Sequence, residues 1–137
     1  MDQTNDFPTD DMELTTILVV KNLEKSKEFY SKVLGAKFFR EYGSTSAVYK
    51  FQNNWILIVT AGEATPDKPN ITFTPPKEPQ TVSHSFTIRV KDCQKSYNVL
   101  VNRGATFLTP PYEWESEVRC FFTDPDGHLF EISEYKE

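Results

Sequence analysis

The chain carries one pattern twice, and this internal repeat limits the possible folds more than any other feature. The segment Val20-Lys21-Asn22 returns seventy residues later as Val90-Lys91-Asp92. Each copy opens a helix-forming stretch, and the two stretches end at Gly35-Ala36 and Gly104-Ala105. Because helix start and helix stop both stay in register, the repeat indicates duplication of one supersecondary unit that buries its helix side against its copy.

Both copies predict the same order of elements, a strand and a helix followed by three short strands. In the first copy we expect a strand at 14–20, a helix that Asn22 caps and Gly35 ends, and strands at 37–42, 47–52 and 55–60. In the second we expect a strand at 85–90, a helix from Asp92 to Gly104, and strands at 106–108, 117–123 and 128–135. The sequence therefore predicts two tandem βαβββ units.

The boundary between the two units is marked by five prolines between residues 66 and 79. We expect an acidic arm at 1–13, a first unit at 14–62, a Pro-rich linker at 63–83 and a second unit at 84–135. A chain of 137 residues is long enough for one sizeable core and too short for two independent ones. The prediction is one compact α+β domain over 14–135.

Charge and composition argue against several classes of partner. The net charge is −5 and no cluster of Lys or Arg is present, which argues against nucleic acid and anionic membranes. The longest apolar run, residues 55–59, is far too short to span a membrane, and the acidic N-terminus does not resemble a signal peptide. Cys93 and Cys120 lack metal-motif spacing, so we expect reduced thiols and a cytoplasmic protein.

Glu131 is the candidate functional residue of the last strand. This strand follows the turn Asp124-Pro125-Asp126-Gly127, and alternation places Glu131 on one face while Phe130 and Ile132 take the other. A carboxylate in mid-strand between apolar residues is a candidate metal ligand, general base or ligand-binding group. The alternative is a structural carboxylate that accepts hydrogen bonds from neighbouring Thr or Ser side chains.

Three motifs together resemble the vicinal oxygen chelate superfamily. They are the helix entry at 22–30 (NLEKSKEFY), the Leu34-Gly35 ending, and the turn at 124–127 that precedes Glu131. This superfamily includes glyoxalase I, bleomycin-resistance proteins, fosfomycin-resistance enzymes and extradiol dioxygenases. The resemblance covers residues 14–135 and implies a mixed sheet that curls around a central cleft, helices outside, and a homodimer.

The resemblance also implies where metal ligands would lie, and most of those positions lack a good donor. The four corresponding positions are Thr15, Ile58, Ser85 and Glu131, of which only Glu131 offers a donor suited to a divalent ion. We therefore expect no cofactor. The alternative is a divalent metal held by Glu131 and His84, but alternation turns His84 to the opposite face unless a bulge intervenes.

The expected cleft is aromatic and contains few charged groups. Strand alternation and the resemblance together give a candidate ligand-binding set of Thr15, Ile17, Tyr49, Trp55, Ile58, Ser85, Thr87, Arg89, Trp114, Phe121 and Glu131. A cavity of this kind is the usual form of a small-molecule site. Its aromatic faces would stack on a planar ligand, and its carboxylate would attract a cationic one.

Three functional hypotheses follow. The leading one is a metal-independent, homodimeric protein that sequesters a planar aromatic or cationic small molecule, as bleomycin-resistance proteins do. The alternative is a glyoxalase- or dioxygenase-like enzyme, a lyase, isomerase or oxygenase, that uses Glu131 as a metal ligand or base. The third is a module that binds a protein partner through its exposed sheet or through residues 66–79.

Overall fold

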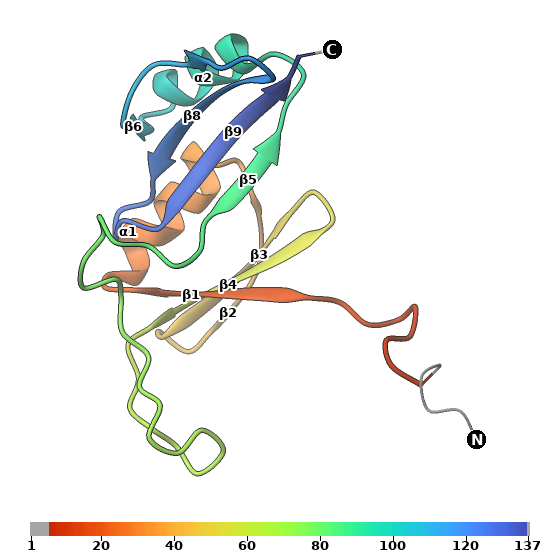
Figure 1. The fold of residues 1–137 in the computed structure, drawn as a ribbon. Helices are drawn as coiled ribbons and strands as arrows, with labels where there is room; N and C mark the ends of the chain where they lie inside the picture. The colour runs from red at the N-terminus through yellow and green to blue at the C-terminus, as the bar shows by residue number, and fades with distance from the viewer. Residues whose placement is uncertain (1–5, 137) are drawn as a thin grey trace.

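A computed structural model describes residues 6–136 of the chain and shows two successive units, coloured red to yellow and green to blue in Figure 1. The first unit contains β1 (Thr15–Val20), α1 (Leu23–Glu28), the π-helical segment η2 (Phe29–Val33), β2 (Lys37–Tyr42), β3 (Ser46–Phe51) and β4 (Asn54–Thr60). The second contains β5 (Phe86–Arg89), α2 (Cys93–Asn102), β6 (Thr106–Phe107), β7 (Tyr112–Glu113), β8 (Glu117–Thr123) and β9 (Leu129–Tyr135).

Each unit forms its own mixed sheet. The first sheet has the order β1-β4-β3-β2, with β1 parallel to β4 and the other pairs antiparallel. The second has the order β5-β9-β8-β6, with β5 parallel to β9. The predicted α+β class and the duplicated order are confirmed, and the short strand β7, which pairs with β8, is an addition that the sequence did not predict.

Both helix starts are capped as the repeat predicted. The side chain of Asn22 accepts a hydrogen bond from the backbone N–H of Lys25, and the side chain of Asp92 accepts one from Lys95, each at 3.0 Å. The first helix then widens into η2, where the Leu34 N–H donates to the Phe29 carbonyl five residues back. Gly35 ends it with a φ of +82°, a conformation that glycine adopts without steric cost.

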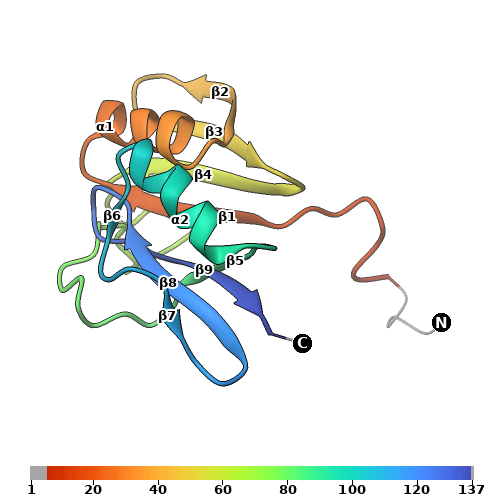
Figure 2. The ribbon, with the colours of Figure 1, turned by 90° about the horizontal axis from the view of Figure 1, so that it is seen from above.

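The helical segment α1–η2 packs against both sheets and forms the centre of the core. The ring of Phe29 lies 6.3 Å from that of Phe130 in the second sheet, and the ring of Tyr30 lies 6.2 Å from that of Tyr49 in the first. Figure 2 shows α1 and α2 on the same side of the molecule, seen from above. The sheet faces that point away from the helices are more exposed, and the candidate site residues lie mostly on them.

The turn at 124–127 ties the second unit to the first. Asp124 is buried and accepts a hydrogen bond from the Tyr30 hydroxyl at 2.8 Å and one from the backbone N–H of His128 at 2.8 Å. His128 in turn bonds through Nε2 to the carbonyl of Val19 in β1, at 2.8 Å. Burial raises the pKa of Asp124, and burial beside this carboxylate raises the pKa of Tyr30 well above its usual range.

The predicted linker is a loop that projects from the two sheets (Figure 1). Its base is held by a β-bridge between Gly62 and Phe73. Further along, Pro79 packs against Gly127, where an added Cβ would lie only 2.7 Å from the Pro79 Cβ. Of the predicted arm, residues 6–13 are exposed and 1–5 lie outside the described residues. Over residues 6–136, no helix has the length and apolar character needed to cross a membrane.

Candidate functional site

Glu131 sits in a row of side chains that crosses three strands of the second sheet. Cα pairing sets Thr87 of β5 beside Glu131 of β9, and Glu131 beside Phe121 of β8. The Thr87 hydroxyl donates a hydrogen bond of 2.6 Å to Glu131 Oε1, and Arg119 Nε lies 3.7 Å from Oε2. Glu131 is only 8% exposed, so this carboxylate is buried with a hydroxyl donor and a guanidinium as partners.

The next row along the same face extends this arrangement. Arg89 Nη1 donates to Ser133 Oγ at 2.7 Å, and Ser133 Oγ donates to Glu117 Oε1 at 2.6 Å. Glu117 also lies 3.4 Å from Arg119 Nη1 and 3.8 Å from Arg89 Nη1. The six side chains form what we call the polar cluster: Thr87, Arg89, Glu117, Arg119, Glu131 and Ser133. It contains two cations and two anions, so its formal charges balance.

Aromatic rings hold both arginines of the polar cluster in place. The Arg119 guanidinium carbon lies 5.2 Å from the centre of the Trp114 ring and 5.7 Å from that of Phe121. The guanidinium carbon of Arg89 lies 4.1 Å from the centre of the Tyr135 ring. These are cation–π distances, and each contact limits the directions in which its arginine points.

The row of the first sheet that corresponds to Thr87, Glu131 and Phe121 is apolar. The partner of Ile17 in β4 is Leu57, and Leu57 in turn pairs with Val48 in β3. The counterpart of Glu131 is therefore Leu57, and the prediction that Ile58 faces the cleft is wrong. Ile58 is fully buried on the helix side, because alternation along β4 places Ile56 and Ile58 on that face and Leu57 on the other.

The placement of Tyr49 in the cleft is also wrong. Tyr49 is fully buried in the core, and its hydroxyl accepts a hydrogen bond from Ser31 Oγ and donates one to the Lys27 carbonyl. The preceding alternate residue, Ala47, is buried on the same face, so the helix side of β3 carries Ala47 and Tyr49. Alternation along β3 groups Tyr49 with the apolar Ala47 and Phe51, whereas Ser46 and Lys50 lie on the other face, so the pattern of this strand itself favours a core position for Tyr49.

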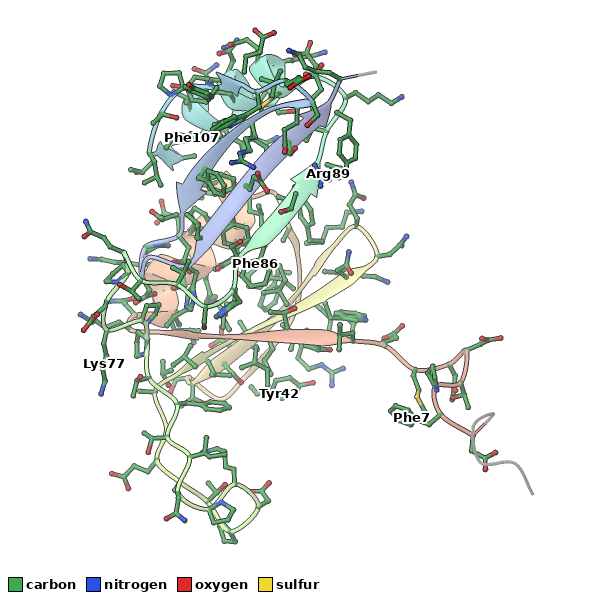
Figure 3. The ribbon with its side chains drawn as sticks, in the orientation of Figure 1. Phe7, Tyr42, Lys77, Phe86, Arg89 and Phe107 are labelled. Atoms are coloured by element: carbon green, nitrogen blue, oxygen red, sulfur yellow. The ribbon has the colours of Figure 1, made fainter. Side chains whose placement is uncertain are left out.

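A groove of about 450 Å³ lies between β5 and the hairpin that joins β3 to β4. It is lined by Thr16, Leu18, Leu34, Phe51, Gln52, Asn54, Trp55, Ile56, Ser85, Phe86, Thr87, Ile88, Arg89 and Phe130. We call this the β5 groove. Figure 3 places Phe86 at the end of β5 that approaches the first sheet and Arg89 at the other end. Thr87 and Arg89 belong to both the groove and the polar cluster, so the two are contiguous.

The β5 groove gathers only part of the predicted cleft. It includes Trp55, Ser85, Thr87 and Arg89, while Phe121 and Glu131 lie beside it in the second sheet. Trp114 is half-exposed at the edge of the polar cluster, where its ring contacts that of Tyr112. Thr15 and Ile17 are exposed on β1 and do not line the groove. The single predicted cleft is therefore two neighbouring surfaces in this chain.

Ile17 instead lines a second hollow, of about 400 Å³, beneath the linker. His84 and His128 line this hollow as well. The ring of His84 packs edge-to-face on Phe86, with centroids 5.7 Å apart, and Glu131 is not among the residues that line either hollow. Between residues 6 and 136 there is no group of three His, Cys, Asp or Glu side chains arranged to hold a metal ion.

Several groups around Glu131 were absent from the predicted set. Glu117 and Ser133 are the main omissions, and both share the face of Glu131 through simple alternation along β8 and β9. The apolar walls of the groove, such as Phe86 and Phe130, were also absent from the predicted set. Strand alternation alone could therefore have identified Glu117 and Ser133. The groove could not be identified in this way, because residues from both units line it.

Comparison with known proteins places these features in a family. The chain is 30% identical over 117 residues to the metallothiol transferase FosB of Lysinibacillus sphaericus, which covers 82% of this chain and 74% of that protein. Its fold is similar to that of a glyoxalase/bleomycin resistance protein/dioxygenase from Nocardioides, with a TM-score of 0.72, 20% identity, and coverage of 98% and 90% of the two chains.

A further solved structure of the same fold is the fosfomycin resistance protein FosX of Listeria monocytogenes, in complex with Mn(II) and a dihydroxypropylphosphonic acid. The TM-score is 0.63 at 17% identity, with coverage of 90% of this chain and 89% of that one. The family model of the Glyoxalase/Bleomycin resistance protein/Dioxygenase superfamily matches residues 13–132, and the chain belongs to this superfamily.

Proposed function

We propose that the protein binds a planar aromatic small molecule in the β5 groove and does so without a metal ion. The observation that carries the proposal is the aromatic lining of this groove, to which Phe51, Trp55, Phe86 and Phe130 contribute. Its volume of about 450 Å³ falls in the range of small-molecule sites. Aromatic walls stack on planar ligands and contribute more than their buried area alone.

The donor set around Glu131 does not fit a divalent ion. The carboxylate is already engaged by the Thr87 hydroxyl and faces the Arg119 guanidinium at 3.7 Å. A cation placed beside this guanidinium would be repelled, and Thr and Ser hydroxyls at the neighbouring positions are poor ligands for such ions. No other described carboxylate, imidazole or thiolate joins Glu131 in a group of three. These features support metal-independent binding.

Between the two ligand classes that the sequence suggested, the polar cluster favours the planar aromatic one. The argument for a cationic ligand relied on a free carboxylate at Glu131. Arg119 lies against Glu131, and Glu117 is shared between Arg89 and Arg119. With both carboxylates paired, the cluster offers little net attraction for a cation.

Calorimetric titration with naphthalene-2-carboxamide, a neutral planar probe, tests the proposal on chelator-treated protein. Trp55→Leu should weaken binding about tenfold or more, because it removes one aromatic wall of the groove. The matched control is Trp114→Leu, which removes the other tryptophan at a position that does not line the groove. Equal effects of the two changes, or no binding to the wild type, would reject the groove as the site.

The second candidate is an enzyme that uses Glu131 as a base or metal ligand. It is favoured by the 30% identity to a protein named as a metallothiol transferase, across most of this chain. Glu131→Gln separates the two candidates because it preserves shape and removes the charge. If the protein is such an enzyme, this change abolishes turnover, whereas a binding protein changes only modestly in affinity for the aromatic probe.

We also propose that the protein is a cytoplasmic homodimer. The apolar row of Ile17, Leu57 and Val48 lies on the face of the first sheet that points away from α1, and Ile17 is 46% exposed. A second copy that covers this row would remove it from water. Cys93 and Cys120 are free thiols, which supports a reducing compartment.

A further inference from the structure

Arg89 is the single formally charged side chain among the described residues that line the β5 groove. The other lining residues are apolar or aromatic, apart from the hydroxyls of Thr16, Ser85 and Thr87 and two amides at the hairpin tip. A groove of this composition presents one localised cation at the end of an apolar, aromatic channel. The groove is therefore mostly apolar with a cation at one end. Such a groove matches a ligand that has an apolar body and one anionic end.

The guanidinium of Arg89 is held in place with donors to spare. Nη1 donates to Ser133 Oγ at 2.7 Å, and the guanidinium lies over the Tyr135 ring at 4.1 Å. Within residues 6–136, no hydrogen bond or ion pair engages its Nε or Nη2. The side chain is 49% exposed, so these donors are open to solvent. A planar guanidinium whose Nε/Nη2 edge is free is suited to a carboxylate, which it binds with two parallel hydrogen bonds.

The nearest anion does not fully occupy this cation. Glu117 Oε1 lies 3.8 Å from Arg89 Nη1, beyond hydrogen-bond distance, and it accepts its short hydrogen bond from Ser133 instead. Glu117 is also shared with Arg119 at 3.4 Å. No hydrogen bond from the described residues therefore ties Arg89 directly to an anion, and its Nε and Nη2 groups are available to a ligand.

We infer that the ligand of the β5 groove is a planar aromatic monocarboxylate whose carboxylate binds Arg89. This inference rests on the proposed function, since it assumes that the groove holds the aromatic body. The half-buried rings of Phe51 and Phe86 contact the ring system, and Arg89 determines both the orientation of the ligand and its charge. The groove should therefore reject cationic ligands, which Arg89 repels. It should bind aromatic acids more tightly than their neutral amides.

Two probes that differ in one group test the inference by calorimetry on chelator-treated protein. Naphthalene-2-carboxylate should bind the wild type about tenfold more tightly than naphthalene-2-carboxamide. Arg89→Gln should reduce this advantage to less than about twofold, because it weakens binding of the carboxylate far more than binding of the amide. Arg89→Lys should retain part of the advantage, because it keeps the charge and loses the bidentate geometry.

The matched control is Lys91→Gln, which removes one positive charge two residues away at an exposed position outside the groove. It should leave the advantage of the carboxylate intact. Equal binding of the two probes to the wild type, or an advantage that survives Arg89→Gln, would overturn the carboxylate assignment while aromatic binding stands. If neither probe binds, the proposed function fails together with the inference.

Discussion

The hydroxyl of Tyr30 donates a buried hydrogen bond of 2.8 Å to Asp124, ninety-four residues further along the chain. Tyr30 belongs to the helical segment of the first unit, and Asp124 begins the turn before the last strand of the second. The bond therefore fixes β9, and Glu131 with it, relative to the first sheet. The arrangement of the β5 groove depends on this link between the units.

Tyr30→Phe should lower the free energy of unfolding by about 1–3 kcal/mol. The change removes the hydroxyl that donates a hydrogen bond to Asp124. One oxygen of this buried carboxylate is then left without a donor. Urea denaturation followed by circular dichroism measures the effect. Tyr42→Phe is the matched control, because Tyr42 is 49% exposed and should change stability by less than about 0.5 kcal/mol. Equal effects of the two changes would contradict the role of this bond.

The contribution of Asp124 to the free energy of unfolding should decrease as pH rises. Burial raises the pKa of Asp124 in the folded protein above its unfolded value of 3.8. The folded chain therefore binds more protons than the unfolded chain between those two pKa values, and stability is lost as pH rises through the folded pKa. Asp124→Asn has no such group, so the difference in unfolding free energy between wild type and variant should decrease as pH rises above 3.8 through the raised folded pKa. A flat difference would contradict the raised pKa.

The two cysteines should be unreactive in the native protein. Cys93 and Cys120 are buried with their sulfurs 3.9 Å apart, and burial raises the pKa of Cys120 to about 12. At pH 8 only about one Cys120 in 10⁴ is then a thiolate, the form that reacts. Labelling with an aromatic disulfide reagent should proceed at both sites in guanidinium and at neither in native buffer. Fast native labelling would show that this part of the core opens.

Leu57→Glu should convert the proposed dimer to monomers. The change places a charge in the middle of the row of Ile17, Leu57 and Val48, which the second copy would cover. Sedimentation velocity measures the outcome, and Val101→Glu on the surface of α2 is the control, because Val101 is 42% exposed. A wild-type monomer, or a dimer that survives Leu57→Glu, would reject this interface.

The repeat and the strand alternation predicted the fold because both are local properties of the sequence. They placed the caps Asn22 and Asp92, the turn at 124–127 and the outward face of Glu131. They failed at Ile58, because apolar residues occupy both faces of β4 and the sequence does not show which face points to the helices. At Tyr49 the alternation of β3 was informative and was not applied, since it groups Tyr49 with Ala47 and Phe51. The β5 groove was also out of reach, because it forms where β5 meets a hairpin from the other unit.

The central claim, metal-independent binding of an aromatic molecule, is tested most directly by one calorimetric experiment. Chelator-treated protein is titrated with naphthalene-2-carboxamide, first without metal and then with saturating Mn(II). Because Arg119 and Thr87 already engage Glu131, the account predicts the same affinity in both titrations. Binding that appears only when Mn(II) is present would contradict it and would favour the metal-dependent enzyme.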